Sequence, residues 1–155
     1  MTSTGLNAAG VLAGIESVLQ AVGGIEQVVT SQSTNPPTDG IGAQVWAGPI
    51  KPVGVRSGLA SVSVLTVTNI RLTMPLATQP PESIDPALLT TLSDVMNALA
   101  GGFTLDGEVA QVDLLGQYGV PMDGIPGYVD YAGVGYRCIT LTVPAVLDDI
   151  WTEAP

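Results

Sequence analysis

The chain has 155 residues, a length typical of one compact domain, and its formal net charge is −10 because 14 acidic residues outnumber 4 basic ones. It contains no histidine and a single cysteine, which excludes histidine-based catalytic triads, histidine-ligated zinc sites, thiolate cages and internal disulfides. Four cations are too few to hold nucleic acid through its phosphates.

The overall composition is apolar rather than charged. Hydrophobic residues make up 46% of the chain and charged residues only 12%, so we expect a single ordered domain over residues 1–155. No stretch is apolar for long enough to span a bilayer, and the first residues lack the basic start of a secretory signal. We therefore expect a soluble protein without a membrane partner. Its excess of apolar residues indicates either surfaces buried against other subunits or a core rich in glycine, alanine and valine.

The N-terminal half begins with a predicted helix. Asn7 can cap it, apolar residues recur at three-and-four spacing over 11–22, and a glycine pair ends it. A short β-branched strand is expected over 25–30, followed by a polar loop over 31–40. A second strand is expected over 43–50, running into turn-forming glycines and prolines.

A long strand and a second helix follow. Residues 59–74 contain neither proline nor glycine, and they alternate in a way that predicts one long strand with one core face. Asp85 and Pro86 are typical of an N-cap and a first-turn proline, so we expect a helix that begins there and ends at Gly101-Gly102. The predicted core face of the strand consists of Val62, Val64, Thr66, Thr68, Ile70 and Leu72.

The C-terminal part alternates again over 109–115 and 128–143, which predicts two more strands. Between them we expect a loop over 116–127, whose two prolines cannot lie in central strands. The order α-β-β-β-α-β-β predicts an α+β domain with a mostly antiparallel sheet flanked by two main helices. The last ten or so residues could form an extended arm.

The chain offers little to catalysis. Asp148-Asp149 could form a metal or acid/base pair, but adjacent carboxylates are more often solvated surface. Asp106-Gly107-Glu108 lacks the spacing of a calcium loop, Ser57 has no base to activate it, and Cys138 lies in an alternating apolar stretch typical of a buried thiol. We expect no catalytic, metal or cofactor site, and no enzyme.

The scarce basic residues are the most informative polar side chains. In so acidic a chain they could pair with carboxylates of a neighbouring copy or with carboxylates of their own chain. Together with the two tryptophans they form the predicted subunit or tube interface, which consists of Trp46, Lys51, Arg56, Arg71, Arg137 and Trp151.

Several segments resemble a known family when taken in order along residues 43–155. They are Ser57-Gly58-Leu59-Ala60-Ser61 with the long strand, Ser83-Ile84-Asp85-Pro86, Val112-Asp113-Leu114-Leu115-Gly116, Tyr118-Gly119-Val120-Pro121, Gly127-Tyr128, Tyr136-Arg137 with Ile139-Thr140-Leu141-Thr142-Val143-Pro144, and Trp151-Thr152-Glu153-Ala154-Pro155. This set is similar to tail-terminator proteins of long-tailed, siphovirus-type bacteriophages of actinobacteria. The first 42 residues match only as helix followed by strand.

The resemblance implies a structural virion protein at the head-proximal end of the phage tail. Such a protein assembles as a ring, commonly a homohexamer, which caps the tail tube and stops its polymerisation. Its other partner is the head completion or connector protein that docks on the ring, and genome DNA passes through the lumen without specific binding. The family provides no functional residue that can be assigned to a position of this chain.

Two alternatives remain at this point. Within the same assembly the chain could be another head-to-tail connector or the tail tube subunit itself, whose copies also form rings. In a different class, it could be a small ligand-binding module that uses Trp46, Tyr118 and Tyr128 around one cleft.

Overall fold

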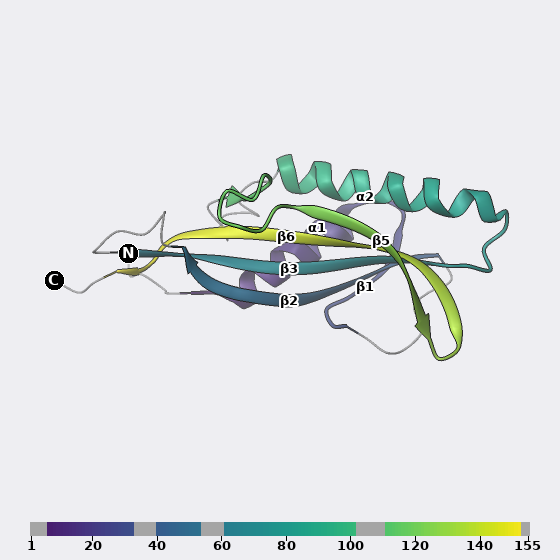
Figure 1. Cartoon of the computed structure of the whole chain (residues 1–155), viewed down its shortest axis with the longest axis horizontal. Coiled ribbons are helices and arrows are strands. Elements are labelled where there is room, and N and C mark those ends of the chain that lie inside the picture. Colours follow the sequence, from purple (N-terminus) through teal and green to yellow (C-terminus); the bar gives the residue numbers. More distant parts are fainter. Residues whose placement is uncertain (1–5, 33–39, 54–60, 102–110, 153–155) are drawn as a thin grey trace.

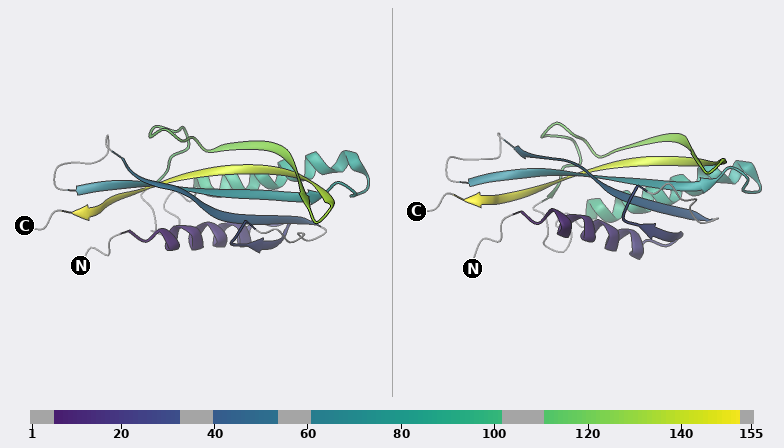
Figure 2. Two further views of the ribbon diagram at one scale, coloured as in Figure 1. Left: turned by 60° about the horizontal axis from the view of Figure 1, so that its bottom comes forward. Right: turned by 90° about the horizontal axis from the view of Figure 1, so that it is seen from below.

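The computed structural model describes residues 6–32, 40–53, 61–101 and 111–152. One mixed β-sheet carries two α-helices on the same face, so the expected α+β class is confirmed (Figures 1 and 2). The elements, in chain order, are α1 (Ala8–Ala21), β1 (Ile25–Val29), β2 (Ile41–Val53), β3 (Ser61–Pro75), the 3₁₀ helix η2 (Pro81–Ser83), α2 (Ile84–Gly101), β4 (Gln111–Val112), β5 (Asp123–Tyr131) and β6 (Val134–Thr152).

The sheet has six strands in the order β1-β2-β3-β6-β4, with β5 also paired to β6. Strands β1 and β2 are parallel, and the other four pairings are antiparallel. The mostly antiparallel prediction is therefore confirmed, although the C-terminal part has one more strand than expected. Strand β6 pairs with β3 on one edge, and on its other edge it pairs first with β5 and then with β4.

Helix α1 begins where the sequence predicts. The side-chain oxygen of Asn7 accepts a hydrogen bond from the backbone N–H of Gly10 at 3.0 Å, which satisfies one of the free donors of the first turn. Val11, Ile15 and Leu19 recur on the buried side of the helix. Gly24 follows with a φ of +92°, a left-handed conformation that favours glycine and turns the chain into β1.

Helix α2 begins earlier than predicted. Its first residue is Ile84, directly after η2, so Asp85 lies inside the first turn and is not the N-cap. The prediction of that cap is wrong because the preceding prolines already turn the chain in a 3₁₀ helix. A carboxylate in the first turn still interacts favourably with the helix dipole. Asp85 is thereby left to bind a distant side chain, as described below.

Strand β2 continues past the glycine and proline at which the sequence predicts a turn. A register shift between Ala47 and Ile50 takes up Gly48-Pro49 inside the strand. A side chain at position 48 would lie 3.0 Å from the backbone oxygen of Val67, so the close approach of β3 requires glycine. Beyond Gln44 no described strand pairs with the outer edge of β2, and prolines are tolerated on such an edge.

The two C-terminal strands β5 and β6 form a hairpin, whereas the sequence predicts a single strand over 128–143. Strand β5 begins inside the predicted loop, and a two-residue turn at Ala132-Gly133 divides the predicted strand 128–143. The predicted strand 109–115 is reduced to the two residues of β4 within the part of it that the structure describes. The last residues as far as Thr152 belong to β6 and pair with the start of β3, so they are part of the sheet rather than an arm.

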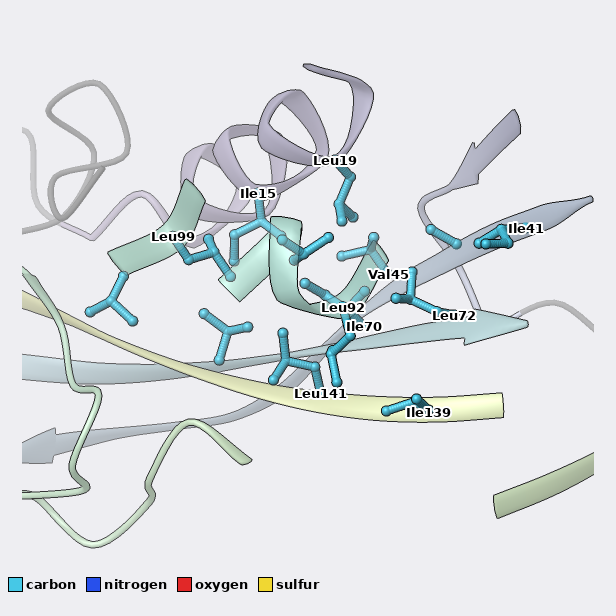
Figure 3. Packing of buried hydrophobic residues seen from close by; sticks show 14 of the residues in the cluster. Ile15, Leu19, Ile41, Val45, Ile70, Leu72, Leu92, Leu99, Ile139 and Leu141 are labelled. Atoms are coloured by element: carbon cyan, nitrogen blue, oxygen red, sulfur yellow. The ribbon is translucent and has the colours of Figure 1, made fainter. Parts of the chain in front are cut away.

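The main hydrophobic core lies between the two helices and the sheet (Figure 3). Burying each large aliphatic side chain there contributes about 1.5–3 kcal/mol relative to exposure. From the strands, this core receives alternate residues, which makes the helix-facing side of the sheet mostly apolar, with Thr66 and Thr68 as buried polar exceptions on β3. Its strand residues include Ala43, Val45, Ile70, Leu72, Ile139, Leu141, Val143 and Ala145.

A second, smaller core lies on the opposite side of the sheet. Leu65 and Val67 of β3 are buried there, so the expectation of a single core face on this strand is wrong. The covering segment is shaped by Asp113, whose buried carboxylate accepts hydrogen bonds from the backbone N–H groups of Gln117 at 2.9 Å and Tyr118 at 3.0 Å. The residues that make up or cover this core are Val53, Leu65, Val67, Val146, Tyr118 and Val120.

Candidate interaction surface

We define the outer face as the side chains of β2, β3, β5 and β6 that point away from the two helices. Alternation fixes its members, because most of the residues between them belong to the main core and the others, such as Arg137, lie on the helix side. In the half of this face away from the smaller core, most side chains of β2, β3 and β6 are polar or aromatic, while the hairpin adds the aliphatic Ile125, Val129 and Val134. The polar and aromatic side chains include Gln44, Trp46, Asn69, Arg71, Thr73, Tyr131, Tyr136, Cys138 and Thr140.

A cation and an aromatic ring meet at the centre of the outer face. The guanidinium of Arg71 lies over the ring of Trp46, with its carbon 5.0 Å from the ring centroid. Such a cation–π contact fixes the orientation of the guanidinium and contributes about 0.5–1 kcal/mol at an exposed site. The structure thus brings together two of the residues that the sequence predicts for an interface.

The tip of the β5–β6 hairpin completes this cluster. Tyr131, buried at the end of β5, donates a hydrogen bond from its hydroxyl to the side-chain oxygen of Gln44 at 2.8 Å. The same hydroxyl accepts a weaker hydrogen bond from Arg71 at 3.4 Å. Its ring meets that of Tyr136 edge to face, with centroids 5.4 Å apart. The hairpin is therefore anchored to β2 and β3 through side chains.

Cys138 lies beside this cluster and is buried, as the sequence predicts. Burial raises the pKa of the thiol above its ordinary value, while the positive charges of Arg71 and Arg137 lower it in part. Because the thiolate is the reactive form, a raised pKa and poor access both slow its chemistry.

We expect iodoacetamide to alkylate Cys138 at pH 7.5 at least about tenfold more slowly in the folded protein than in the protein unfolded by guanidinium. Mass spectrometry of timed samples measures both rates, and free cysteine provides the reference rate for each solvent. Equal rates in the folded and unfolded protein would contradict the protected position of this thiol.

Arg137 lies on the other side of the sheet and is engaged within its own chain. Its Nε donates to Asp85 at 2.9 Å, its Nη1 donates to the backbone oxygen of Gly127 at 3.2 Å, and its guanidinium carbon lies 4.6 Å from the ring centroid of Tyr128. The hydrogen bond with Asp85 raises the pKa of Arg137 above its ordinary value. Of the two pairings that the sequence left open, Arg137 adopts the intrachain one.

A shallow hollow of about 360 Å³ adjoins this ion pair. Tyr128 is 71% exposed and Leu76 is 44% exposed at its border, so the hollow has a partly apolar rim. It is lined by Leu76, Pro81, Glu82, Ile84, Asp85, Tyr128 and Arg137.

The remaining predicted interface residues are placed as follows. Lys51 is exposed on β2, on the same side of the sheet as Trp46 and Arg71. Arg56 lies outside the described residues, and for Trp151 only the backbone is described, as part of β6. The structure therefore brings Trp46, Lys51 and Arg71 to one face.

The three aromatic residues suggested for a ligand cleft do not line a common cavity. Trp46 and Tyr118 belong to the outer side of the sheet, whereas Tyr128 stacks on Arg137 on the helix side. Which side of the sheet each ring faces depends on the bounds and pairing of the strands, and the presence of three aromatic residues in the sequence does not predict it. This version of a ligand-binding module is wrong.

Other features considered in the sequence provide no assembled site in the described part of the chain. No group of three or more histidine, cysteine, aspartate or glutamate residues is close enough there to hold a metal ion. Ser57 and Asp106-Gly107-Glu108 fall outside the described residues, as do the side chains of Asp148-Asp149. None of the helices described here is both long and apolar enough to cross a membrane.

Two residues of the cluster were missed by the sequence analysis. Gln44 and Tyr131 are separated by 87 positions, and only the pairing of β2 with β3 and the course of the hairpin bring them together. A signal was present in the alternation for Gln44, because this residue lies between Ala43 and Val45, which face the core. A polar side chain at such a position predicts a polar second face.

Comparisons with known proteins find a likeness in structure but not in sequence. No protein family matches the chain, and no curated protein does. Among solved structures, the chain is similar to the sheath/tube terminator of the PVC extracellular contractile injection system in its extended state, determined by cryo-EM. The TM-score is 0.48 with 13% sequence identity, and the match covers 98% of this chain but 61% of that one. A likeness of this size does not establish a shared function.

Proposed function

We propose that this chain is a tail terminator, a structural virion protein that forms a ring on the head-proximal end of a phage tail tube. The observation that carries the proposal is the outer face, where Trp46, Arg71 and Tyr131 form a fixed aromatic and cationic cluster on a subunit whose helices cover only the other face. Arginine, tryptophan and tyrosine are the residues most enriched at the energetic centres of protein interfaces. A protein built for assembly needs such a surface and no catalytic group.

The outer strands of the sheet support a closed assembly. Pro49, Lys51 and Pro52 lie on the part of β2 whose outer edge has no described neighbour, and Pro126 lies within β5. Prolines and lysines on edge strands oppose the addition of further strands, because proline lacks an N–H and lysine must keep its charge in water. Contacts between copies then depend on faces and side chains, which can close a ring through a fixed rotation.

The charge of the chain agrees with a lumen crossed by DNA. Six copies, the number that the resemblance implies, would carry a formal charge of about −60, and a field of that sign does not retain phosphates. The finer parts of the proposal, namely the siphovirus tail, the hexamer, the head connector as partner and the head-proximal position, are supported by the ordered sequence resemblance over residues 43–155.

Deleting the gene from the parent phage is the direct test of this function. We expect tail tubes of uncontrolled length and heads without joined tails, because nothing would then cap the last tube ring. Electron microscopy of lysates measures tube length and the fraction of joined particles. Supplying the intact chain from a plasmid is the control and should restore both. Normal tails on joined heads would exclude a terminator.

The behaviour of the isolated protein separates the terminator from its alternatives. A terminator forms one closed ring and stops, whereas a tube subunit has complementary upper and lower faces and grows into filaments. Negative-stain images of concentrated protein distinguish the two. A connector would also form a ring, but its deletion would leave tube length unchanged while heads and tails stay separate.

A further inference from the structure

Arg71 is a half-buried cation that has no counter-ion among the described residues. Its Nη1 donates to Tyr131, but its Nε is buried and has no hydrogen-bond acceptor, and no carboxylate forms an ion pair with it in the part of the chain that the structure describes. Two residues along β3 on the same face, the hydroxyl of fully buried Thr73 also has no hydrogen-bond partner within the described residues. Buried polar groups are normally hydrogen-bonded, so this part of the outer face lacks partners within the part of the chain that the structure describes.

A comparison with Arg137 shows which kind of group Arg71 lacks among the described residues. Both arginines lie in strands of the same sheet and both stack on an aromatic ring, at 5.0 Å and 4.6 Å. Arg137 has a carboxylate at 2.9 Å, while Arg71 has none among the described residues. A guanidinium forms paired hydrogen bonds with carboxylates through its planar donor edge, and its orientation on Trp46 is already fixed. The group that fits Arg71 is therefore a carboxylate.

A second copy of this chain can supply that carboxylate. The chain has 14 acidic residues and only 4 basic ones, so most of its carboxylates cannot be neutralised internally. Helix α2 covers the side of the sheet opposite to the outer face (Figure 2). Neighbours in a ring meet through two different patches of the subunit, and opposite sides satisfy that requirement. The outer face of one copy would then meet the solvent-facing side of α2 in the next.

One carboxylate on that side of α2 is available. Asp85 is engaged with Arg137, whereas Asp94 is exposed about two and a half turns further along and forms no hydrogen bond or ion pair within the described residues. Its neighbours on the exposed side are small or polar, including Thr90, Ser93 and Asn97, which allows close approach of another subunit. We propose that Arg71 binds the Asp94 carboxylate of a second copy. This inference rests on the proposed ring, and it names the contact that closes it.

Reversing the two charges tests the pair. We expect Arg71→Asp or Asp94→Arg alone to weaken ring formation about tenfold or more, because each places like charges together in a partly buried contact. The double variant, Arg71→Asp with Asp94→Arg, should regain most of the assembly. Native mass spectrometry over a range of protein concentrations measures the ring and monomer populations. Asp130→Arg provides the matched control, because Asp130 is also exposed but pairs with Gly135 on the side of the sheet away from Arg71, and it should leave the ring intact.

Circular dichroism shows whether each variant folds, and Arg71→Gln replaces Arg71→Asp should the latter be unfolded. Rings that persist in both single variants would overturn the pair while leaving the proposed function intact. Loss in both single variants without recovery in the double variant would overturn Asp94 as the partner of Arg71. A wild-type protein that stays monomeric at every concentration would overturn the ring, and the pair with it.

Discussion

Replacing Leu141 by alanine will lower the free energy of unfolding by about 2–5 kcal/mol. Leu141 is fully buried in β6, pairs with Ile70 of β3 and faces the helices in the main core (Figure 3). Removing most of its side chain leaves a cavity that two long strands and a helix cannot easily close. Domains of this size are stable by only about 5–15 kcal/mol, so the loss is a large part of the total.

Urea unfolding followed by circular dichroism measures this difference from the shift of the midpoint at a constant slope. The same substitution at Leu115 is the matched control, because that side chain is 83% exposed. We expect Leu115→Ala to change the free energy of unfolding by less than about 0.5 kcal/mol. A similar effect at both positions would contradict the placement of β6 at the centre of the sheet.

Replacing Asp113 by alanine is expected to cost about 2–3 kcal/mol of stability. The residue is only 2% exposed, and its carboxylate accepts hydrogen bonds from the backbone N–H groups of Gln117 and Tyr118. Without it the turn loses two charge-assisted hydrogen bonds, and the segment that holds Tyr118 over the smaller core is released. The effect therefore combines lost hydrogen bonds with exposed apolar surface.

The same urea experiment tests this prediction, with Asp123→Ala as the control for removing an exposed carboxylate. Asp113→Asn adds a finer comparison, because the amide keeps one acceptor oxygen and should lose less stability than alanine does. Hydrogen exchange of the amides of Gln117 and Tyr118 should accelerate in Asp113→Ala. Unchanged protection of both amides would show that the turn does not depend on this carboxylate.

Local signals account for the parts of the fold that the sequence predicts well. The cap at Asn7, the apolar spacing of both helices and the uninterrupted alternation of β3 each depend on residues close together in the chain. The hairpin was missed because its turn uses Ala132, with a φ of +53°, before Gly133. Alanine is not typical of such a turn, which usually has Asn or Gly there, and the alternation on its two sides reads as one strand.

The candidate interface residues were likewise only partly predictable from the sequence. The scarcity of basic residues identified Arg71 and Arg137 as informative, but which of them is satisfied depends on a contact between positions 52 apart. That contact exists because α2 begins before Asp85 and leaves its carboxylate free to bind Arg137. Long-range pairing of this kind follows from the three-dimensional arrangement of α2 and β6, which no local pattern encodes.

The central position of β6 has a consequence for how the protein is made. Although β6 follows all the other described strands along the sequence, it fills the gap between β3 and the β4 and β5 strands. Until the ribosome releases it, β3 has no partner on that edge and exposes aliphatic residues such as Leu65, Ile70 and Leu72. A long unpaired strand of this composition promotes aggregation. The sheet can therefore form only after β6 has left the ribosome, and translation that stops before β6 would release a product that cannot complete its sheet.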